Sequence, residues 1–324
     1  KQLYNNPYTV YQNRNLTEIK PVSKLYALKN NKVVINEKFA HEYTRAVQLH
    51  PADFSLDQLS FHKRALSCQD IRKSYLKYAQ ISPGNLARRI DTLTVVAWNI
   101  WHGGKHWTKG KDGWDSRLRI VEILQEKDVD IVLMQETYSS GDFIAAELGY
   151  YFATTSDWDY CFQGSNISIL SRFPIKELFV SPETEFNNVT AKIAISETQE
   201  IYAMSNWYGM NAFSKVFNFN QPRFNQSDSI PVFFGGDFNA VPHTDGGESP
   251  ASRKLIKNGF TDAFRSLHPD VKSNPGYTHR SGRRIDQLYY KGRELTNIST
   301  ELISNWPGGF PSDHFPIIAR FVVN

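Results

Sequence analysis

Short apolar runs recur along residues 91–324 and alternate with stretches of helical pattern. Runs of about four to eight residues rich in Val, Ile, Leu and Phe are typical of buried strands. The strands predicted in this way cover residues 93–98, 131–134, 166–171, 175–180, 189–195, 201–205, 232–234, 285–290 and 315–322. Many strands with few helices favour two packed sheets with helices outside them.

Three helices are predicted between these strands. The first covers residues 115–126, and its apolar face is formed by Leu118, Val121 and Leu124. The second covers residues 142–148, with Asp142 as its N-cap and Gly149 as its stop. Pro250 and Gly259 bracket the third.

The first 90 residues follow a different pattern. Two extended runs, residues 24–28 and 32–36, flank Asn30-Asn31 and predict a hairpin, because Asn tolerates the positive φ of tight turns. Residues 53–80 show helical spacing, and Ser-Pro-Gly-Asn at residues 82–85 breaks it. We therefore expect a small N-terminal α/β extension of unknown role in residues 1–90 and a catalytic domain in residues 91–324.

Composition limits the class of protein. The net charge of +4 fits an anionic substrate without the dense basic runs of a DNA-coating protein. Two cysteines are too few for a disulfide framework or a Cys-rich zinc site, and no apolar run is long enough to span a membrane. Because the chain begins with Lys, we expect that an N-terminal segment has been removed, which fits a secreted or exported protein but leaves the compartment open.

Polar side chains follow several of the predicted strands at their carboxyl ends. Asn99 ends the first strand, Glu136 follows the second, and Asp237 and Asn239 follow the run at 232–234. Strand carboxyl ends are favoured ligand sites in layered α/β architectures. Asp237 and Asn239 are two residues apart, so an extended backbone would point both side chains the same way.

A second polar group lies near the C-terminal strand. Asp313 and His314 precede that strand, and Asp286 lies near the start of the one predicted at 285–290. An imidazole beside a carboxylate, with another Asp to orient it, suits the acid–base chemistry of hydrolysis. Together with Asn99, Glu136 and Asp237 these residues form an oxygen-rich set that suits Mg²⁺ or Mn²⁺ better than zinc.

These segments together resemble the endonuclease/exonuclease/phosphatase (DNase I-like) superfamily. The matching segments are Val96-Ala-Trp-Asn-Ile, Val132-Leu-Met-Gln-Glu-Thr, Gly164-Ser-Asn-Ile-Ser-Ile-Leu-Ser-Arg-Phe-Pro, Gly235-Gly-Asp-Phe-Asn, Arg284-Ile-Asp and Ser312-Asp-His-Phe-Pro-Ile. The resemblance implies an α+β fold, a four-layer αββα sandwich of two packed mixed sheets. It also implies hydrolysis of phosphoric esters by metal-assisted attack of water, without a covalent intermediate.

The resemblance further implies a role for each matched residue. Asn99, Glu136 and Asp313 would form the metal site, with Glu136 as a direct ligand. Asp237 would position or deprotonate the attacking water, and Asn239 would hold the phosphoryl oxygens. His314, oriented by Asp286, would stabilise the charge that develops on the scissile phosphate.

One position departs from the family pattern. Many members carry a second His in an Asn-x-His-Leu-like segment, and this chain has Asn206-Trp207-Tyr208 there. Abasic-site endonucleases also lack this His and use Asn and Tyr, so Asn206 or Tyr208 is a candidate phosphate contact. The alternative is that Trp207 impairs catalysis and that the chain is a binding module.

The substrate is left open at this stage. The segment from Trp101 to Trp114 mixes three tryptophans with lysines, so Lys105 and Trp107 are candidate substrate contacts, as is Arg284 beside Asp286. A nucleic acid, a phospholipid head group such as that of sphingomyelin, or an inositol phosphate would each fit. We expect a monomer acting on a phosphodiester, most simply a nuclease-like phosphodiesterase.

Overall fold

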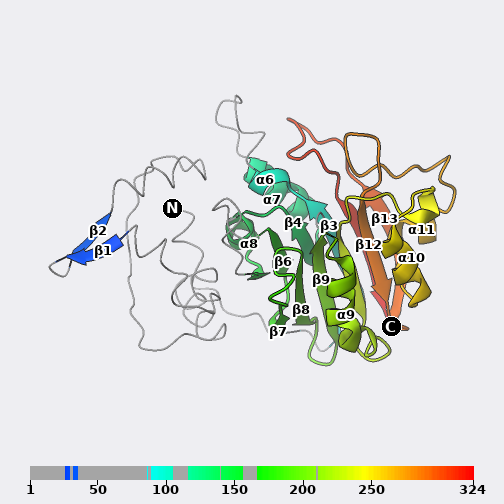
Figure 1. Cartoon of the computed structure of the whole chain (residues 1–324), viewed down its shortest axis with the longest axis horizontal. Coiled ribbons are helices and arrows are strands. Elements are labelled where there is room, and N and C mark those ends of the chain that lie inside the picture. The colour runs from blue at the N-terminus through cyan, green and yellow to red at the C-terminus, as the bar shows by residue number, and fades with distance from the viewer. Residues whose placement is uncertain are drawn as a thin grey trace.

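Two six-stranded sheets form the centre of the molecule (Figure 1). The computed structural model describes residues 26–29, 32–35, 86, 89–104, 116–138, 140–155, 166–208 and 211–324. Strands β1 (Tyr26–Lys29) and β2 (Lys32–Ile35) pair antiparallel and confirm the predicted hairpin. The helical stretch expected at 53–80 lies outside the described residues, and the domain boundary near residue 90 stays a prediction.

The first sheet brings three segments of the chain to the same end. Its strand order is β13-β14-β3-β4-β6-β5. The strands are β3 (Thr92–Asn99), β4 (Ile131–Gln135), β5 (Tyr151–Thr154), β6 (Ile167–Ser171), β13 (Leu295–Leu302) and β14 (Ile317–Val323). β3 and β4 run parallel, and β14 runs antiparallel to β3. The carboxyl ends of β3 and β4 therefore lie beside the start of β14.

The second sheet has the order β11-β12-β10-β9-β8-β7. The strands are β7 (Ile175–Phe179), β8 (Asn188–Ala194), β9 (Glu200–Trp207), β10 (Val232–Asp237), β11 (Thr261–Asp262) and β12 (Asp286–Lys291). β9 and β10 run parallel and end together. β12 runs antiparallel to β10, and its register places Asp286 opposite Asp237. Backbone pairing thus places these two acidic residues side by side on neighbouring strands.

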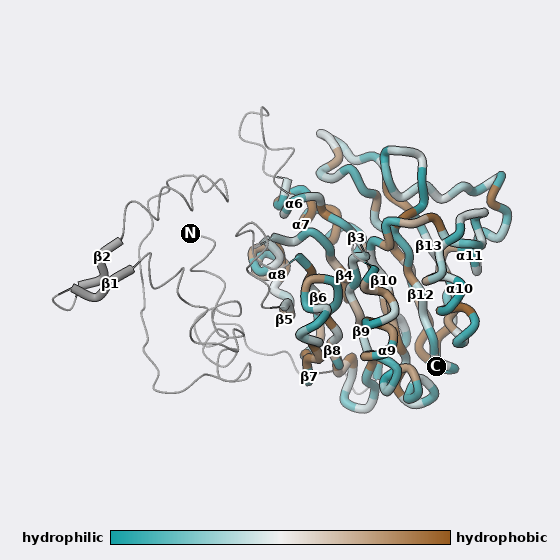
Figure 2. Tube along the Cα trace, viewed as in Figure 1, coloured by the Kyte–Doolittle hydropathy of each residue, from teal (hydrophilic) through white to brown (hydrophobic). Residues whose placement is uncertain are grey.

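Three apolar clusters hold four layers together. One lies between the sheets and includes Val95, Leu133, Ala203 and Phe233. The second packs the outer face of the first sheet against helices α7 (Ser116–Glu126) and α8 (Gly141–Leu148). The third packs the outer face of the second sheet against α9 (Phe213–Phe224) and α10 (Pro250–Lys257). The order helix, sheet, sheet, helix confirms the predicted αββα sandwich, and Figure 2 shows hydrophobic stretches recurring along its strands.

Three short helical segments complete the described elements. They are α6 (Trp101–Gly104), η2 (His243–Asp245) and α11 (Ala263–Leu267). Within the described residues, no helix combines the length and apolar character needed to cross a membrane.

Several local predictions are wrong in detail. Leu118 is 49% exposed, and α7 instead buries Ile120, Val121, Ile123 and Leu124. The N-cap of α8 is Ser140 rather than Asp142, which lies in the first turn, whereas Gly149 ends the helix in the left-handed conformation as expected. Strands β5, β11 and β13 had no predicted counterpart, because they are short or alternate polar residues with few apolar ones.

Gly236 is a position where a side chain cannot fit. Its φ is 146°, and a Cβ there would lie 1.9 Å from the carbonyl oxygen of Asn206 on β9. We expect Gly236→Ala to reduce the free energy of unfolding by about 2–4 kcal/mol, from backbone strain and forced separation of β9 and β10. Urea denaturation would measure this.

The control is Gly149→Ala, where nothing lies within 4 Å of the added Cβ. We expect this change to reduce the free energy of unfolding by only about 1 kcal/mol. An equal loss in both variants would contradict the steric argument.

Candidate active site

Asn99 and Glu136 meet at the carboxyl ends of β3 and β4. The amide nitrogen of Asn99 donates to Glu136 Oε1 at 3.1 Å and to Asp237 Oδ2 at 3.0 Å. Its oxygen accepts the backbone N–H of Trp101 at 2.9 Å, which fixes the orientation of the amide. Asn99 therefore bridges the two sheets and holds both carboxylates in place.

The backbone after Asn99 forms a strained left-handed turn. Trp101, His102, Gly103 and Gly104 all have positive φ, between 47° and 71°. Non-glycine residues pay about 1–3 kcal/mol for such a conformation. In this turn the left-handed backbone directs the N–H of His102 to Glu136 Oε2 at 3.0 Å. It also directs the N–H of Gly103 to the backbone carbonyl of Glu136. Glu136 itself has a φ of 53°, so strained backbone concentrates around this carboxylate.

Asp237 is the last residue of β10 and is almost fully buried. Its carboxylate accepts the backbone N–H of Asn239 at 2.8 Å and the Asn239 amide at 3.2 Å. Asn239 has a φ of 51° and lies in a turn rather than on an extended strand, so its side chain folds back to Asp237. Burial, and then the charge of Asp286, raise the pKa of Asp237 to about 7.

His314 and Asp286 form a buried pair between the sheets. His314 Nδ1 lies 3.1 and 2.9 Å from the two oxygens of Asp286. Burial alone would lower the pKa of His314, but the facing Asp286 carboxylate outweighs burial and the pKa is raised to about 10. His314 is therefore an imidazolium at neutral pH, with its Nε2–H on the side away from Asp286.

Asp313 lies next to this imidazole. Its Oδ1 is 3.9 Å from His314 Nε2 and its Oδ2 is 3.6 Å from His279 Nε2. Oδ1 is buried and has no hydrogen-bond partner. Oδ1 therefore faces the His314 imidazolium without a hydrogen bond and keeps its lone pairs for a further ligand.

Sequence reasoning missed four residues that build this part of the site. Thr278 accepts the backbone N–H groups of Ile285 and Asp286 through its hydroxyl. The Ser312 hydroxyl donates to the Asn99 carbonyl, and the Trp98 indole donates to the His314 carbonyl. His279 packs its ring on that of His314, with 4.6 Å between centroids. Ser312 and Trp98 had a local signal, because they lie within the Ser-Asp-His and Val-Ala-Trp-Asn-Ile segments.

Asn206 and Tyr208 are placed as supports rather than as phosphate contacts. Asn206 is fully buried, and its amide hydrogens go to the carbonyls of Met204 and Gly235. Its oxygen accepts from the Tyr208 hydroxyl and from Asn188. Burial raises the pKa of Tyr208 well above its usual value. With every amide hydrogen used, Asn206 has none to offer a phosphate, so this predicted role is corrected.

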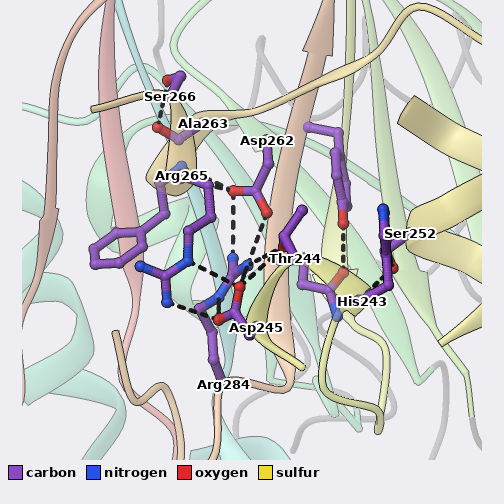
Figure 3. Close-up of polar contacts among 12 residues, drawn as sticks. His243, Thr244, Asp245, Ser252, Asp262, Ala263, Arg265, Ser266 and Arg284 are labelled. Atoms are coloured by element: carbon purple, nitrogen blue, oxygen red, sulfur yellow. Dashed lines mark hydrogen bonds and ion pairs between the residues drawn. The ribbon is translucent and has the colours of Figure 1, made fainter. Parts of the chain in front are cut away.

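Arg284, predicted as a substrate contact, is buried in an ion-pair network instead of facing solvent. Its side chain is 1% exposed and forms ion pairs with Asp245 at 2.7 Å and Asp262 at 2.8 Å. Figure 3 shows its guanidinium and that of Arg265 meeting at Asp245. Although burial opposes ionisation, these guanidiniums hold the pKa of Asp245 well below its usual value. The network anchors the chain immediately before Asp286.

The remaining predicted contacts, Lys105 and Trp107, lie outside the described residues. The structure thus brings seven predicted residues to one end of the two sheets. They are Asn99, Glu136, Asp237, Asn239, Asp286, Asp313 and His314.

Comparison with known proteins agrees with this arrangement. The family model described as Endonuclease/Exonuclease/phosphatase family matches residues 96–314, which span every one of these seven side chains. The chain belongs to this family. Members of the endonuclease/exonuclease/phosphatase family are typically phosphoric ester hydrolases.

Solved structures with the same fold include several family members. The catalytic domain of human Nocturnin, with bound sulfate, is 18% identical, with 74% of this chain and 96% of that chain covered and a TM-score of 0.55. Truncated Caenorhabditis elegans TDP2 is 19% identical, with 72% and 98% covered and a TM-score of 0.55. An AP endonuclease from Archaeoglobus fulgidus is 18% identical, with 70% and 98% covered and a TM-score of 0.51.

A sequence relative covers a similar part of the chain. An uncharacterized protein of Caenorhabditis elegans is 22% identical, with 71% of this chain and 91% of the relative covered. At these identities the solved structures establish the fold, and the chemistry has to be argued from the site itself.

Proposed function

We propose that this chain is a divalent-metal-dependent hydrolase of phosphodiester bonds, acting as a nuclease-like phosphodiesterase. The observation that carries the proposal is the meeting of Glu136, Asp237 and Asp313 with the imidazolium of His314 at one end of the two sheets. Negative groups for a cation and positive groups for a phosphate lie side by side there. The catalytically impaired alternative has less support, because the residues expected to act on the phosphate are present and held by hydrogen bonds.

The residues present fit a hard divalent cation. Asp313 Oδ1 is buried without a partner, and the Glu136 side chain keeps 13% of its surface exposed. Carboxylate oxygens are the ligands that Mg²⁺ and Mn²⁺ prefer. Glu136 and Asp313 would hold the ion, and Asn99 would hold Glu136, because the Asn99 nitrogen faces that carboxylate. When bound, the cation neutralises phosphate charge and polarises the P–O bond.

Asp237 is suited to act as the base. Its raised pKa of about 7 lets it take a proton from water near neutral pH. The water oxygen bonds to phosphorus while the bond to the leaving oxygen breaks, and solvent protonates the departing alkoxide. No side chain forms a bond to phosphorus in this scheme.

His314 and Asn239 stabilise the charge that develops on the phosphoryl oxygens. His314 offers an Nε2–H that Asp286 keeps charged, and Asn239 offers an amide at an exposed turn. Donors held in place before the reaction need no reorganisation when charge develops, which is the largest source of rate enhancement in many enzymes.

The test is metal-dependent turnover of bis-p-nitrophenyl phosphate. We expect hydrolysis with Mg²⁺ or Mn²⁺, loss of hydrolysis with EDTA, and a decrease in kcat/KM of at least about 100-fold in Glu136→Gln. Glu147→Gln, an exposed change on α8, is the matched control and should retain full activity. Hydrolysis that survives both EDTA and Glu136→Gln would contradict the proposal. Parallel assays with plasmid DNA, sphingomyelin and inositol phosphates would identify the substrate class.

A further inference from the structure

His279 is held against the catalytic segment by backbone pairing. The Arg280 N–H donates to the Asp313 carbonyl at 3.0 Å, and the Phe315 N–H donates to the Thr278 carbonyl at 2.7 Å. These bonds form a bridge between His279 and His314, and a second bridge joins His279 to Arg283. The position of the His279 ring is therefore set by the register of two backbone segments.

The position of the His279 proton is also set by the backbone. The Ser281 N–H donates to His279 Nδ1 at 3.1 Å, and the Ser281 hydroxyl lies 2.8 Å from the same nitrogen. Because Nδ1 accepts a backbone hydrogen, the neutral imidazole carries its own proton on Nε2. That N–H faces Asp313 Oδ2, which is 3.6 Å away.

The two oxygens of Asp313 thus have different surroundings. Oδ2 faces His279 Nε2 at 3.6 Å, whereas Oδ1 is buried, has no hydrogen-bond partner and lies 3.9 Å from His314 Nε2. His279, Asp313 and His314 each bring one possible ligand atom within 4.8 Å of the others. A proton on His279 Nε2 leaves no lone pair there for a metal, so the ring is suited to orient Asp313 rather than to bind the ion.

We infer that His279 is a positioning residue for the metal site. Its Nε2–H faces Oδ2 of Asp313 across 3.6 Å, close enough to bias the carboxylate orientation so that Oδ1 is presented to the divalent cation. The inference rests on the proposed function, because it assumes that Asp313 is a ligand. Partners that orient a ligating side chain typically account for 10–100-fold in metal affinity.

Direct measurement of Mn²⁺ binding by calorimetry tests this without an activity assay. Gln places an amide N–H about as far along the side chain as His Nε2, whereas Asn reaches only as far as Nδ1. We expect His279→Asn to weaken Mn²⁺ binding about 10-fold and His279→Gln to retain affinity within about threefold. His268→Asn is the matched control, since it removes an imidazole that contacts the Thr300 carbonyl instead, and it should leave Mn²⁺ affinity unchanged.

A double variant separates positioning from a general structural effect. When Asp313→Asn is already present, adding His279→Asn should weaken Mn²⁺ binding no further, because the carboxylate that His279 orients has already been replaced. Wild-type affinity in His279→Asn would overturn the inference, and so would equal weakening in the Asn and Gln variants. Absence of Mn²⁺ binding in the wild type is a different result, which would overturn the metal-dependent function and this inference with it.

Discussion

Asp286→Asn is expected to decrease kcat for phosphodiester hydrolysis by about 10²–10⁴-fold at pH 7. The cause lies in the buried His314. Burial favours the neutral imidazole, and the Asp286 charge at 2.9 Å outweighs it. Asn at position 286 can still contact Nδ1 but carries no charge. Burial then dominates, and the imidazolium that would face the phosphate in the proposed mechanism is lost.

The pH dependence of kcat/KM would distinguish this cause from a change in structure. His314 acts when protonated, so wild-type activity should decline as the pH rises through about 10. Asp237 acts when ionised, so activity should rise with pH through its pKa, which is about 7 without metal and lower beside a bound cation. Asp286→Asn should move the decline to lower pH, because the charge that raised the pKa of His314 is gone.

The control for this prediction is an exposed carboxylate outside the candidate active site. Asp228→Asn removes an exposed carboxylate paired with Arg293 and should leave the pH profile unchanged. If Asp286→Asn lost activity while its kcat/KM still declined only near pH 10, Asp286 would not be the group that keeps His314 charged.

Arg284→Met is expected to reduce the free energy of unfolding by about 3–5 kcal/mol, the largest stability effect we predict. Asp245 and Asp262 are both buried, with side chains 4% and 3% exposed. Removal of the guanidinium leaves Asp262 with its helix-cap bonds alone, and Asp245 with Arg265 as its remaining charged partner. Breaking one side of a buried ion pair costs this much because the other charge stays desolvated.

Urea denaturation would measure this difference against an exposed pair. Arg293→Met removes a guanidinium that is 83% exposed and paired with Asp228, and it should change stability by about 0.5 kcal/mol or less. Similar losses in the two variants would show that the buried network in Figure 3 contributes no more than a surface contact.

The sequence was most informative where chemistry and local pattern coincide. Asn99, Glu136 and Asp237 each follow an apolar run, and the recurrence of this pattern at several strand ends, rather than any one residue, carries the signal. Two packed sheets with helices outside them followed from strand number and helix spacing, because both depend on local periodicity, and the resemblance to the family supplied the four-layer order. The roles that failed depend on partners far along the chain. Arg284 could be seen as buried only once Asp245 and Asp262 were placed beside it.

The role inferred for His279 also depends on a residue far along the chain and could not be predicted from the sequence. Its proton is placed by Ser281, but its function depends on Asp313, which is 34 residues away and reaches it through backbone pairing. No periodicity in the sequence encodes that register. The role predicted for Asn206 does not fit its contacts, because an amide at the end of a strand can bond to the backbone as readily as to a ligand. Its two hydrogens go to the carbonyls of Met204 and Gly235, and the sequence does not show where those carbonyls lie.

The position of β14 in its sheet has a consequence for how the protein is made. β14 is the final strand in sequence, yet it lies between β13 and β3, and His314 immediately precedes it. During translation, Asp237 and Asp286 can pair in the second sheet before β14 exists. The imidazole of His314 reaches the site only when the ribosome has delivered this strand. A nascent chain is therefore expected to be inactive until synthesis has passed β14, however complete the second sheet already is.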